Sequence, residues 1–315
     1  MRPEEILRLF PDGVRDRWRE VAKQAENLQE IRFRAGMPLS VWIDNRERFV
    51  DVRGEIVDRP QKAARITPEE LEELLKHLCR YSVYAFADEI RQGFLTVQGG
   101  HRVGVAGQVI LDGDGRIKNM KYIRYLNIRI AHQVRGAADS VIPFIFEKGH
   151  VLNTLLISPP GGGKTTMLRD IIRQVADGTI YGEGVNVSVV DERSEIAGSY
   201  LGVSQNDVGI RTDVLDGCPK VEGMMLLIRS MAPQVLAVDE LGSIEDVQAL
   251  QMVNGCGCRL LATVHGGSLE EIRHKNYMRY VIEEGLFERY VTLERKTGIC
   301  RVTGIYDGEG KSCIN

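Results

Sequence analysis

The sequence predicts an α/β fold, with a C-terminal domain built on a parallel sheet and a smaller N-terminal α+β domain. Beyond residue 151, short runs rich in β-branched residues alternate with helical stretches, as in parallel sheets covered by helices. These runs are 155–157, 187–190, 235–238 and 260–264. Before residue 135, short alternating apolar stretches separated by turns indicate an antiparallel sheet. The length of 315 residues suits two domains.

One helix is clearly marked in the N-terminal half. Thr67 has the character of an N-cap, Pro68 suits the first helical turn, and leucines follow at helical spacing up to Leu78. Strands are expected at 30–33, 39–43, 93–97, 101–109 and 126–130, with a turn at 112–115. We therefore assign residues 1–135 to the α+β domain, 136–150 to a linker, and 151–315 to the α/β domain.

Composition narrows the function classes. A formal net charge of −3 gives no general attraction to nucleic acids or acidic membranes. The six cysteines are scattered, which indicates reduced thiols rather than a disulfide framework. Apolar runs such as 141–146 are much shorter than the about 18 residues of a membrane helix. We expect a cytoplasmic protein that reaches a membrane only through partners, with no nucleic-acid partner.

A phosphate-binding loop follows the first strand of the C-terminal domain. An apolar strand leads into a glycine-rich loop and then into a helix, which is the context of a P-loop (Walker A). Ser158 stands where the usual pattern has glycine. The lysine reaches the β- and γ-phosphates, and the first threonine binds Mg²⁺. The predicted ligands are ATP and Mg²⁺, held by Pro160, Gly161, Gly162, Gly163, Lys164, Thr165 and Thr166.

Two acids follow the strand at 235–238. Asp239 is predicted to bind Mg²⁺ together with Thr165, and Glu240 to polarise the attacking water, as in a Walker B strand. The alternative is a buried strand that ends in two solvated acids.

Polar residues also end two further strands. Asp191, Glu192 and Glu195 follow the strand at 187–190, and His265 ends the strand at 260–264. A carboxylate there could act as the general base, and a threonine or histidine at the end of the second strand, Thr263 or His265, could sense the γ-phosphate. Which acid is the base stays open. The alternatives are a charged loop and a structural histidine.

These motifs resemble those of a known family. The P-loop, the acid box at 191–195, the pair 239–240 and the strand end at 263–266 come in the order found in type II and type IV secretion ATPases. The chain also resembles the stage III sporulation AA family of endospore-forming bacteria. That closer resemblance rests on segments 30–39, 100–107, 126–131 and 207–216.

The resemblance implies a RecA-like motor domain in a hexameric ring. It implies a place on the mother-cell side of a channel complex that joins mother cell and forespore. It also implies that N-terminal arginines approach the nucleotide, with Arg102 and Arg129 as matching candidates beside Arg124.

The predicted function is an ATP-hydrolysing ring motor that powers assembly of, or transport through, such a channel. Its expected partners are further copies of itself and membrane channel proteins. The alternative from another class is a nucleic-acid-remodelling P-loop ATPase. A nucleotide-dependent scaffold with little turnover is a third possibility.

Overall fold

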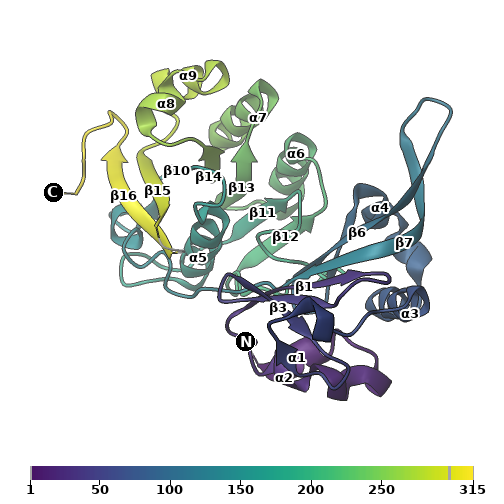
Figure 1. Cartoon of the computed structure of the whole chain (residues 1–315). Helices are drawn as coiled ribbons and strands as arrows, with labels where there is room; N and C mark the ends of the chain where they lie inside the picture. Colours follow the sequence, from purple (N-terminus) through teal and green to yellow (C-terminus); the bar gives the residue numbers. More distant parts are fainter. Residues whose placement is uncertain (1, 297–298, 315) are drawn as a thin grey trace. The chain divides into compact units, whose positions relative to one another are not determined.

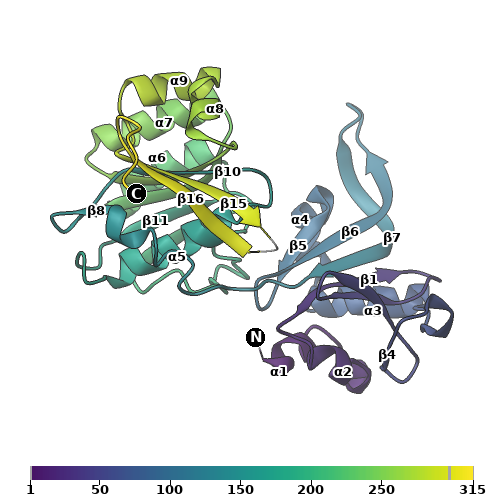
Figure 2. The same cartoon turned by 60° about the vertical axis from the view of Figure 1, so that its left-hand side comes forward.

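The computed structural model describes residues 2–296 and 299–314. The chain forms two compact units, Met1–His132 and Gln133–Asn315. Figures 1 and 2 show each unit as a sheet with helices packed on it. None of the helices in the described ranges is long and apolar enough to cross a membrane.

The N-terminal unit is an antiparallel sheet of order β4-β3-β2-β1-β7-β6-β5. Its strands are β1 (Leu28–Arg34), β2 (Ser40–Ile43), β3 (Arg46–Val50), β4 (Ile56–Val57), β5 (Phe94–Val97), β6 (His101–Leu111) and β7 (Ile117–Arg129). Its helical segments are α1 (Pro3–Leu7), η1 (Asp12–Trp18), α2 (Arg19–Ala22), η2 (Pro60–Lys62), α3 (Pro68–Leu78), η3 (Val83–Phe86) and α4 (Ala87–Gln92).

The predicted helix after Thr67 is confirmed as α3. The Thr67 side chain accepts a hydrogen bond from the Glu70 backbone, and the Glu70 side chain returns one, so a capping box holds the helix start. Its four leucines are buried. One of them, Leu74, lines the same cavity as Phe10, Trp18 and Phe33, and the Phe10 and Trp18 rings stack at 4.0 Å.

The C-terminal unit is a mainly parallel sheet of order β12-β11-β13-β14-β10-β15-β16, in which only β16 is antiparallel to its neighbour. Its strands are β10 (Thr154–Ser158), β11 (Val187–Asp191), β12 (Thr212–Asp216), β13 (Val235–Leu241), β14 (Arg259–His265), β15 (Arg289–Lys296) and β16 (Ile299–Asp307). Its helical segments are η4 (Ile142–Phe144), α5 (Lys164–Asp177), α6 (Lys220–Met231), α7 (Ile244–Gly255), α8 (Leu269–Arg273) and α9 (Asn276–Glu283). A small two-stranded sheet joins β8 (Phe146–Glu147) and β9 (His150–Val151).

Helices cover both faces of this sheet. Alternate residues of each central strand enter opposite cores, as Leu155 and Leu156 of β10 illustrate. Helix α5 packs on one face, whereas α6, α7, α8 and α9 pack on the other (Figure 1). The predicted α/β class is therefore confirmed. The parallel order brings the carboxyl ends of β10, β11, β13 and β14 to one edge of the sheet, where ligands bind in folds of this type.

Residues 136–150 differ from the expected linker. Ala138, Val141, Ile142 and Ile145 are buried in the core on the α5 face of the second unit. The Ala138 N–H also donates to the buried carboxylate of Asp170 on α5, at 2.9 Å. The apolar residues of this short segment therefore extend the core, which explains why the second unit begins at Gln133.

Candidate nucleotide-binding site

The glycine-rich loop connects β10 directly to α5. Strand β10 is buried along its whole length, and α5 begins at Lys164. Gly161 has φ of 71°, and Gly163, the N-cap of α5, has φ of 93°. Only glycine adopts such angles readily, and the first N–H groups of a helix lack partners within the helix. The loop and helix start therefore form an anion site of the kind that binds phosphates.

Two of these glycines are also required because neighbouring side chains leave no room for a Cβ atom. A Cβ at Gly162 would collide with the Ser158 hydroxyl, and a Cβ at Gly163 would lie 2.6 Å from Cys300 Cβ on β16. Ser158, which replaces the usual glycine, is fully buried, and its Oγ donates to the Pro159 carbonyl at 3.0 Å. A serine therefore fits at the start of this loop.

An oxygen-rich site lies beside the helix start. The Thr165 hydroxyl donates to Asp239 Oδ2 at 2.7 Å, and the Thr263 hydroxyl contacts the other oxygen, Oδ1. Mg²⁺ prefers oxygen ligands, and in nucleotide sites it takes one or two from the protein and others from phosphate and water. Thr165 and Asp239 fit that requirement. Within residues 2–296 and 299–314, no larger cluster of metal-binding side chains occurs.

Lys164, Glu240 and His265 meet in one cluster. Lys164 Nζ lies 2.9 Å from His265 Nε2 and 3.7 Å from Glu240 Oε2, while Glu240 Oε1 lies 2.9 Å from His265 Nε2. Arg193, from the loop after β11, reaches the same carboxylate at 3.5 Å. Glu240 and His265, from two strand ends, thus contact the P-loop lysine, and Arg193 from a third strand end contacts Glu240.

The backbone around Glu240 is irregular. Glu240 has φ of 60°, and the pairing of β13 with β14 shifts register between Val238 and Leu241. The Glu240 N–H donates to the Thr263 hydroxyl at 2.8 Å, which holds this bulge in place. Bulges next to sites often redirect a side chain. Burial disfavours the charged form of Glu240, but Lys164, His265 and Arg193 outweigh it and lower the pKa. 

Asp191 lies in a position unlike that of a free general base. Its side chain is 2% exposed, and its two oxygens accept three backbone hydrogen bonds, from Glu195, Ile196 and Ala197, at 2.8–3.0 Å. Burial raises the pKa of Asp191, and the three N–H groups oppose that rise. Arg169 of α5 donates to the carbonyls of Glu195 and Ile196. Asp191 therefore shapes the loop that carries the remaining box residues.

The other two acids of the box differ in their surroundings. Glu192 pairs with Lys220 of α6 at 2.8 Å. Glu195 is exposed, and its backbone is fixed by Asp191 and Arg169. Arg193 is the box residue that reaches Glu240 of the lysine cluster, at 3.5 Å.

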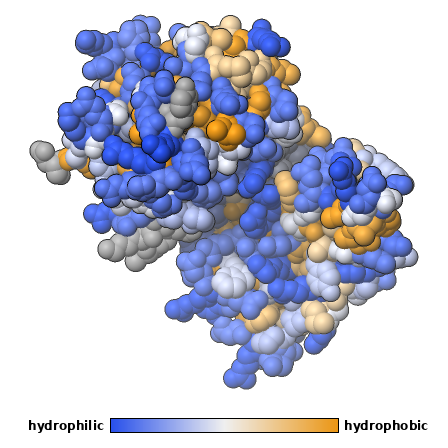
Figure 3. All heavy atoms as spheres, turned by 90° about the horizontal axis from the view of Figure 1, so that it is seen from above, coloured by the Kyte–Doolittle hydropathy of each residue, from blue (hydrophilic) through white to orange (hydrophobic). Residues whose placement is uncertain are grey.

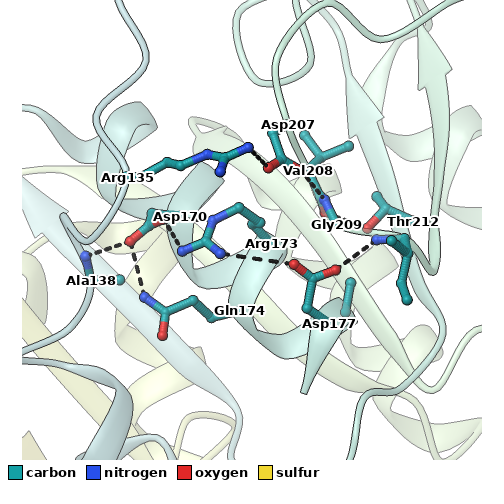
Figure 4. A network of polar contacts seen from close by, with 12 residues as sticks. Arg135, Ala138, Asp170, Arg173, Gln174, Asp177, Asp207, Val208, Gly209 and Thr212 are labelled. Carbon is teal, nitrogen blue, oxygen red and sulfur yellow. Dashed lines mark hydrogen bonds and ion pairs between the residues drawn. The ribbon is translucent and has the colours of Figure 1, made fainter. Parts of the chain in front are cut away.

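The end of α5 opposite the P-loop is anchored by a polar network (Figure 4). Asp170 accepts from Arg173 at 2.7 Å and from Gln174 at 3.0 Å, in addition to Ala138. Asp177 accepts from the Ile210 N–H at 2.8 Å. Arg135 pairs with Asp207 at 2.6 Å, which ties the start of the unit to the segment before β12. The contacts of Asp170 and Asp177 thereby fix the C-terminal half of the helix that begins at the phosphate loop.

Arg102 and Arg129 lie side by side on the N-terminal sheet. They face each other in the register of β6 and β7, so they share one face of that sheet. The Arg102 guanidinium lies 3.7 Å from the centre of the Phe94 ring, and Arg129 is exposed. Their role at a nucleotide stays a prediction.

Some site residues were not predicted. Arg193 was inside the acid box but was not singled out, although a cation next to strand-end acids is a usable signal. The sequence suggests Thr263 only as a sensor of the γ-phosphate, whereas its hydroxyl here contacts Asp239 and accepts from the Glu240 N–H. Cys300 carried no signal, because its contact with Gly163 depends on how the last strands fold back.

Fold and site together define the class: this is a P-loop NTPase fold of the secretion-ATPase type that includes an N-terminal α+β unit. The family described as "Sporulation stage III, protein AA" matches residues 1–313, and the chain belongs to this family. It is 37% identical to Stage III sporulation protein AA of Bacillus subtilis (strain 168), over 97% of this chain and 95% of that protein.

Two solved structures show the same fold. The ATPase DotB of Legionella pneumophila is similar with a TM-score of 0.59 and 15% identity, over 95% of this chain and 82% of DotB. The pilus retraction motor PilT, solved with bound ADP, has a TM-score of 0.58 and 17% identity, over 91% of this chain and 81% of PilT. The predicted resemblance to secretion ATPases is confirmed at the level of fold.

Proposed function

We propose that this protein binds ATP with Mg²⁺ and hydrolyses it. The observation that carries the proposal is the joint placement of the P-loop, the Thr165–Asp239 pair and the Lys164–Glu240–His265 cluster at one sheet edge. A phosphate cradle alone supports binding, whereas a carboxylate held beside it also supports activation of water.

Each group in the cluster has a role that its position suggests. The loop amides and Lys164 bind the phosphates, with Pro160 and Thr166 at the two ends of the cradle. Thr165 and Asp239 would hold Mg²⁺, which neutralises phosphate charge when bound. Glu240 orients the attacking water, because its lowered pKa keeps it ionised. His265 bridges Lys164 and Glu240, so it can respond when phosphate displaces that contact.

The cellular role that we propose is that of a ring motor in sporulation. The chain belongs to a sporulation family and shares its fold with proteins named as an ATPase and a pilus retraction motor. We propose a homo-oligomer, in the form of a hexamer, in which Arg102 or Arg129 reaches a nucleotide in the same or a neighbouring chain. It would act from the mother-cell cytoplasm and contact the membrane through channel proteins.

The test is Mg²⁺-dependent ATP hydrolysis by the purified chain. Lys164→Ala should abolish binding of a fluorescent ATP analogue, because it removes the charge that faces the phosphates. Lys148→Ala changes an exposed lysine of the same unit and is the matched control. Unchanged affinity in Lys164→Ala would contradict the site. Hydrolysis that depends on added DNA or RNA would instead favour a nucleic-acid-remodelling ATPase.

A further inference from the structure

A two-stranded arm leaves the N-terminal sheet. Strand β5 pairs with β6 only at residues 101–104, and β1 pairs with β7 only at 125–129. Beyond those contacts, residues 108–121 pair only with each other (Figures 1 and 2). At its base, Tyr122 has φ of 48°, and a Cβ at Gly107 would lie 2.8 Å from Ile123 Cα. This bulge bends the arm, as bulges generally do.

One face of the arm is apolar and exposed. Val109 lies opposite Met120, and Leu111 lies opposite Ile117, so these four side chains share a face. Leu111 is 58% exposed and Ile117 45%. In Figure 3, which looks down on the molecule, hydrophobic side chains stand among hydrophilic ones on the right, where the arm lies. Because an isolated two-stranded ribbon is at best marginally stable in water, this face favours a covering partner.

Basic side chains outnumber acidic ones on the arm, by three to two between residues 108 and 121. Arg116, Lys118 and Lys121 are exposed along β7 and its turn. Asp112 is engaged within the turn, where its carboxylate accepts from the N–H groups of Asp114 and Arg116 at 2.9 Å. The arm therefore presents apolar side chains flanked by cations.

A pocket with the complementary character lies under the same sheet. A cavity of about 330 Å³ opens between η1, α3 and β1, with apolar walls that include Trp18 and Leu74. Glu69, Glu70 and Glu73 also line it; the Glu70 carboxylate accepts from the Thr67 N–H and the Glu73 carboxylate from the Tyr81 hydroxyl. Arg17 also lines it, and its Nε is buried without a hydrogen-bond partner in the described part of the chain. An incoming turn, with its carbonyl groups, could accept from that nitrogen.

The arm cannot fill the pocket of its own chain. In both views the arm points away from α1 (Figures 1 and 2), and the pocket is lined by the neighbouring segments η1, α3 and β1. A second copy of the chain offers a pocket for the arm and an arm for the pocket. In that contact the apolar side chains of the arm would face the apolar walls of the pocket, and its basic side chains would face the glutamates.

We propose that the arm of one copy docks into the acidic, apolar pocket of the next copy. The contact joins two different surfaces, so it is a head-to-tail interface that can close into a ring. The inference rests on the proposed function only in taking the active form to be a homo-oligomer. It adds the contact through which neighbouring N-terminal units join.

Sedimentation velocity of the full-length chain, over a range of concentrations, tests the contact by charge reversal. The arm variant is Lys118→Glu/Lys121→Glu and the pocket variant is Glu69→Lys/Glu73→Lys, which leaves the capping Glu70 unchanged. Each should weaken self-association about tenfold or more. The chain with all four changes should return to near the wild-type constant. Arg53→Glu/Lys62→Glu, both at exposed positions, is the matched control and should assemble normally.

Three results would overturn the inference. These are a wild-type chain that stays monomeric at all concentrations, single-surface variants that assemble normally, and a combined variant that does not regain assembly. The third result would point to a different protein as the occupant. Leu111→Ser, which keeps all charges, should also weaken assembly, and normal assembly would count against the apolar contact.

ATP binding is measured on the same samples. Assembly as expected without ATP binding would remove the proposed function and leave this contact. ATP binding without self-association would keep the proposed nucleotide site and remove this contact between copies.

Discussion

Replacing Glu240 by glutamine should tighten ATP binding while it slows hydrolysis. Two cationic groups and a histidine ring surround this carboxylate: Lys164 Nζ at 3.7 Å, Arg193 at 3.5 Å and His265 Nε2 at 2.9 Å. Without nucleotide, Glu240 therefore forms an ion pair with Lys164, and the phosphates must compete with Glu240 for this lysine. Glutamine keeps the size of the side chain and removes the competing charge.

The magnitude follows from the distance between the charges. Two unit charges about 4 Å apart interact by about 1 kcal/mol in water and about 4 kcal/mol at an effective dielectric constant of about 20. Because Glu240 is one-third exposed, the lower value applies. About 1 kcal/mol corresponds to roughly fivefold tighter binding. Turnover should fall about 10²- to 10⁴-fold, as for loss of one positioned base.

Equilibrium titration with a fluorescent ATP analogue and a steady-state phosphate-release assay measure the two effects. The gain in affinity should shrink as salt rises, because screening weakens the charge competition. Glu245→Gln, at an exposed position in the first turn of α7, is the matched control. Near-normal turnover in Glu240→Gln would refute the water-orienting role and return Glu192 and Glu195 to consideration.

Three further variants test other parts of the structure. Arg102→Ala and Arg129→Ala should lower turnover far more than ATP affinity, by up to about 10³-fold if either acts as an arginine finger. Thr165→Ala should raise the Mg²⁺ concentration needed for half-maximal hydrolysis about 10- to 100-fold, because it removes a metal ligand. Burial and nearby His132 lower the pKa of His101 to about 4 from 6.5. The neutral form is thus favoured in the folded state. The contribution of His101 to the free energy of unfolding, about 3 kcal/mol, is fully present above pH 6.5 and should be lost as the pH falls towards 4.

Each of these has a control and a contrary outcome. Arg91→Ala, on α4, should leave turnover unchanged, and equal losses in all three arginine variants would remove the finger interpretation. Thr165→Ser keeps the hydroxyl and should need ordinary Mg²⁺ concentrations. For His101, urea unfolding followed by tryptophan fluorescence reports the N-terminal unit, because both tryptophans of the chain lie there. His101→Asn keeps an acceptor for the Ala131 N–H but cannot titrate, so an equally steep pH dependence in that variant would contradict the assignment.

The sequence by itself determined the elements and groups that depend on local spacing. The strand, loop and helix around Lys164 can be predicted from contiguous residues. The polar groups at the carboxyl end of each parallel strand can also be predicted, because they directly follow the apolar run of that strand. The pairing of Thr165 with Asp239 could be expected because the parallel strands bring their ends to one edge. The start of α3 could also be predicted from local sequence, because Thr67 and Glu70 form a capping box within one helical turn.

Tertiary structure alone decided what depends on contacts between distant segments. Asp191 and Glu240 both follow apolar strands, yet the loop after β11 folds back onto Asp191, whereas a bulge turns Glu240 towards Lys164. Cys300 meets Gly163 only because β16 returns beside the P-loop. The sequence of residues 136–150 predicted a linker, because the burial of their apolar side chains depends on packing against α5 and its core. Local sequence sets backbone preference and side-chain chemistry, but burial and charge neighbours are properties of the packed chain.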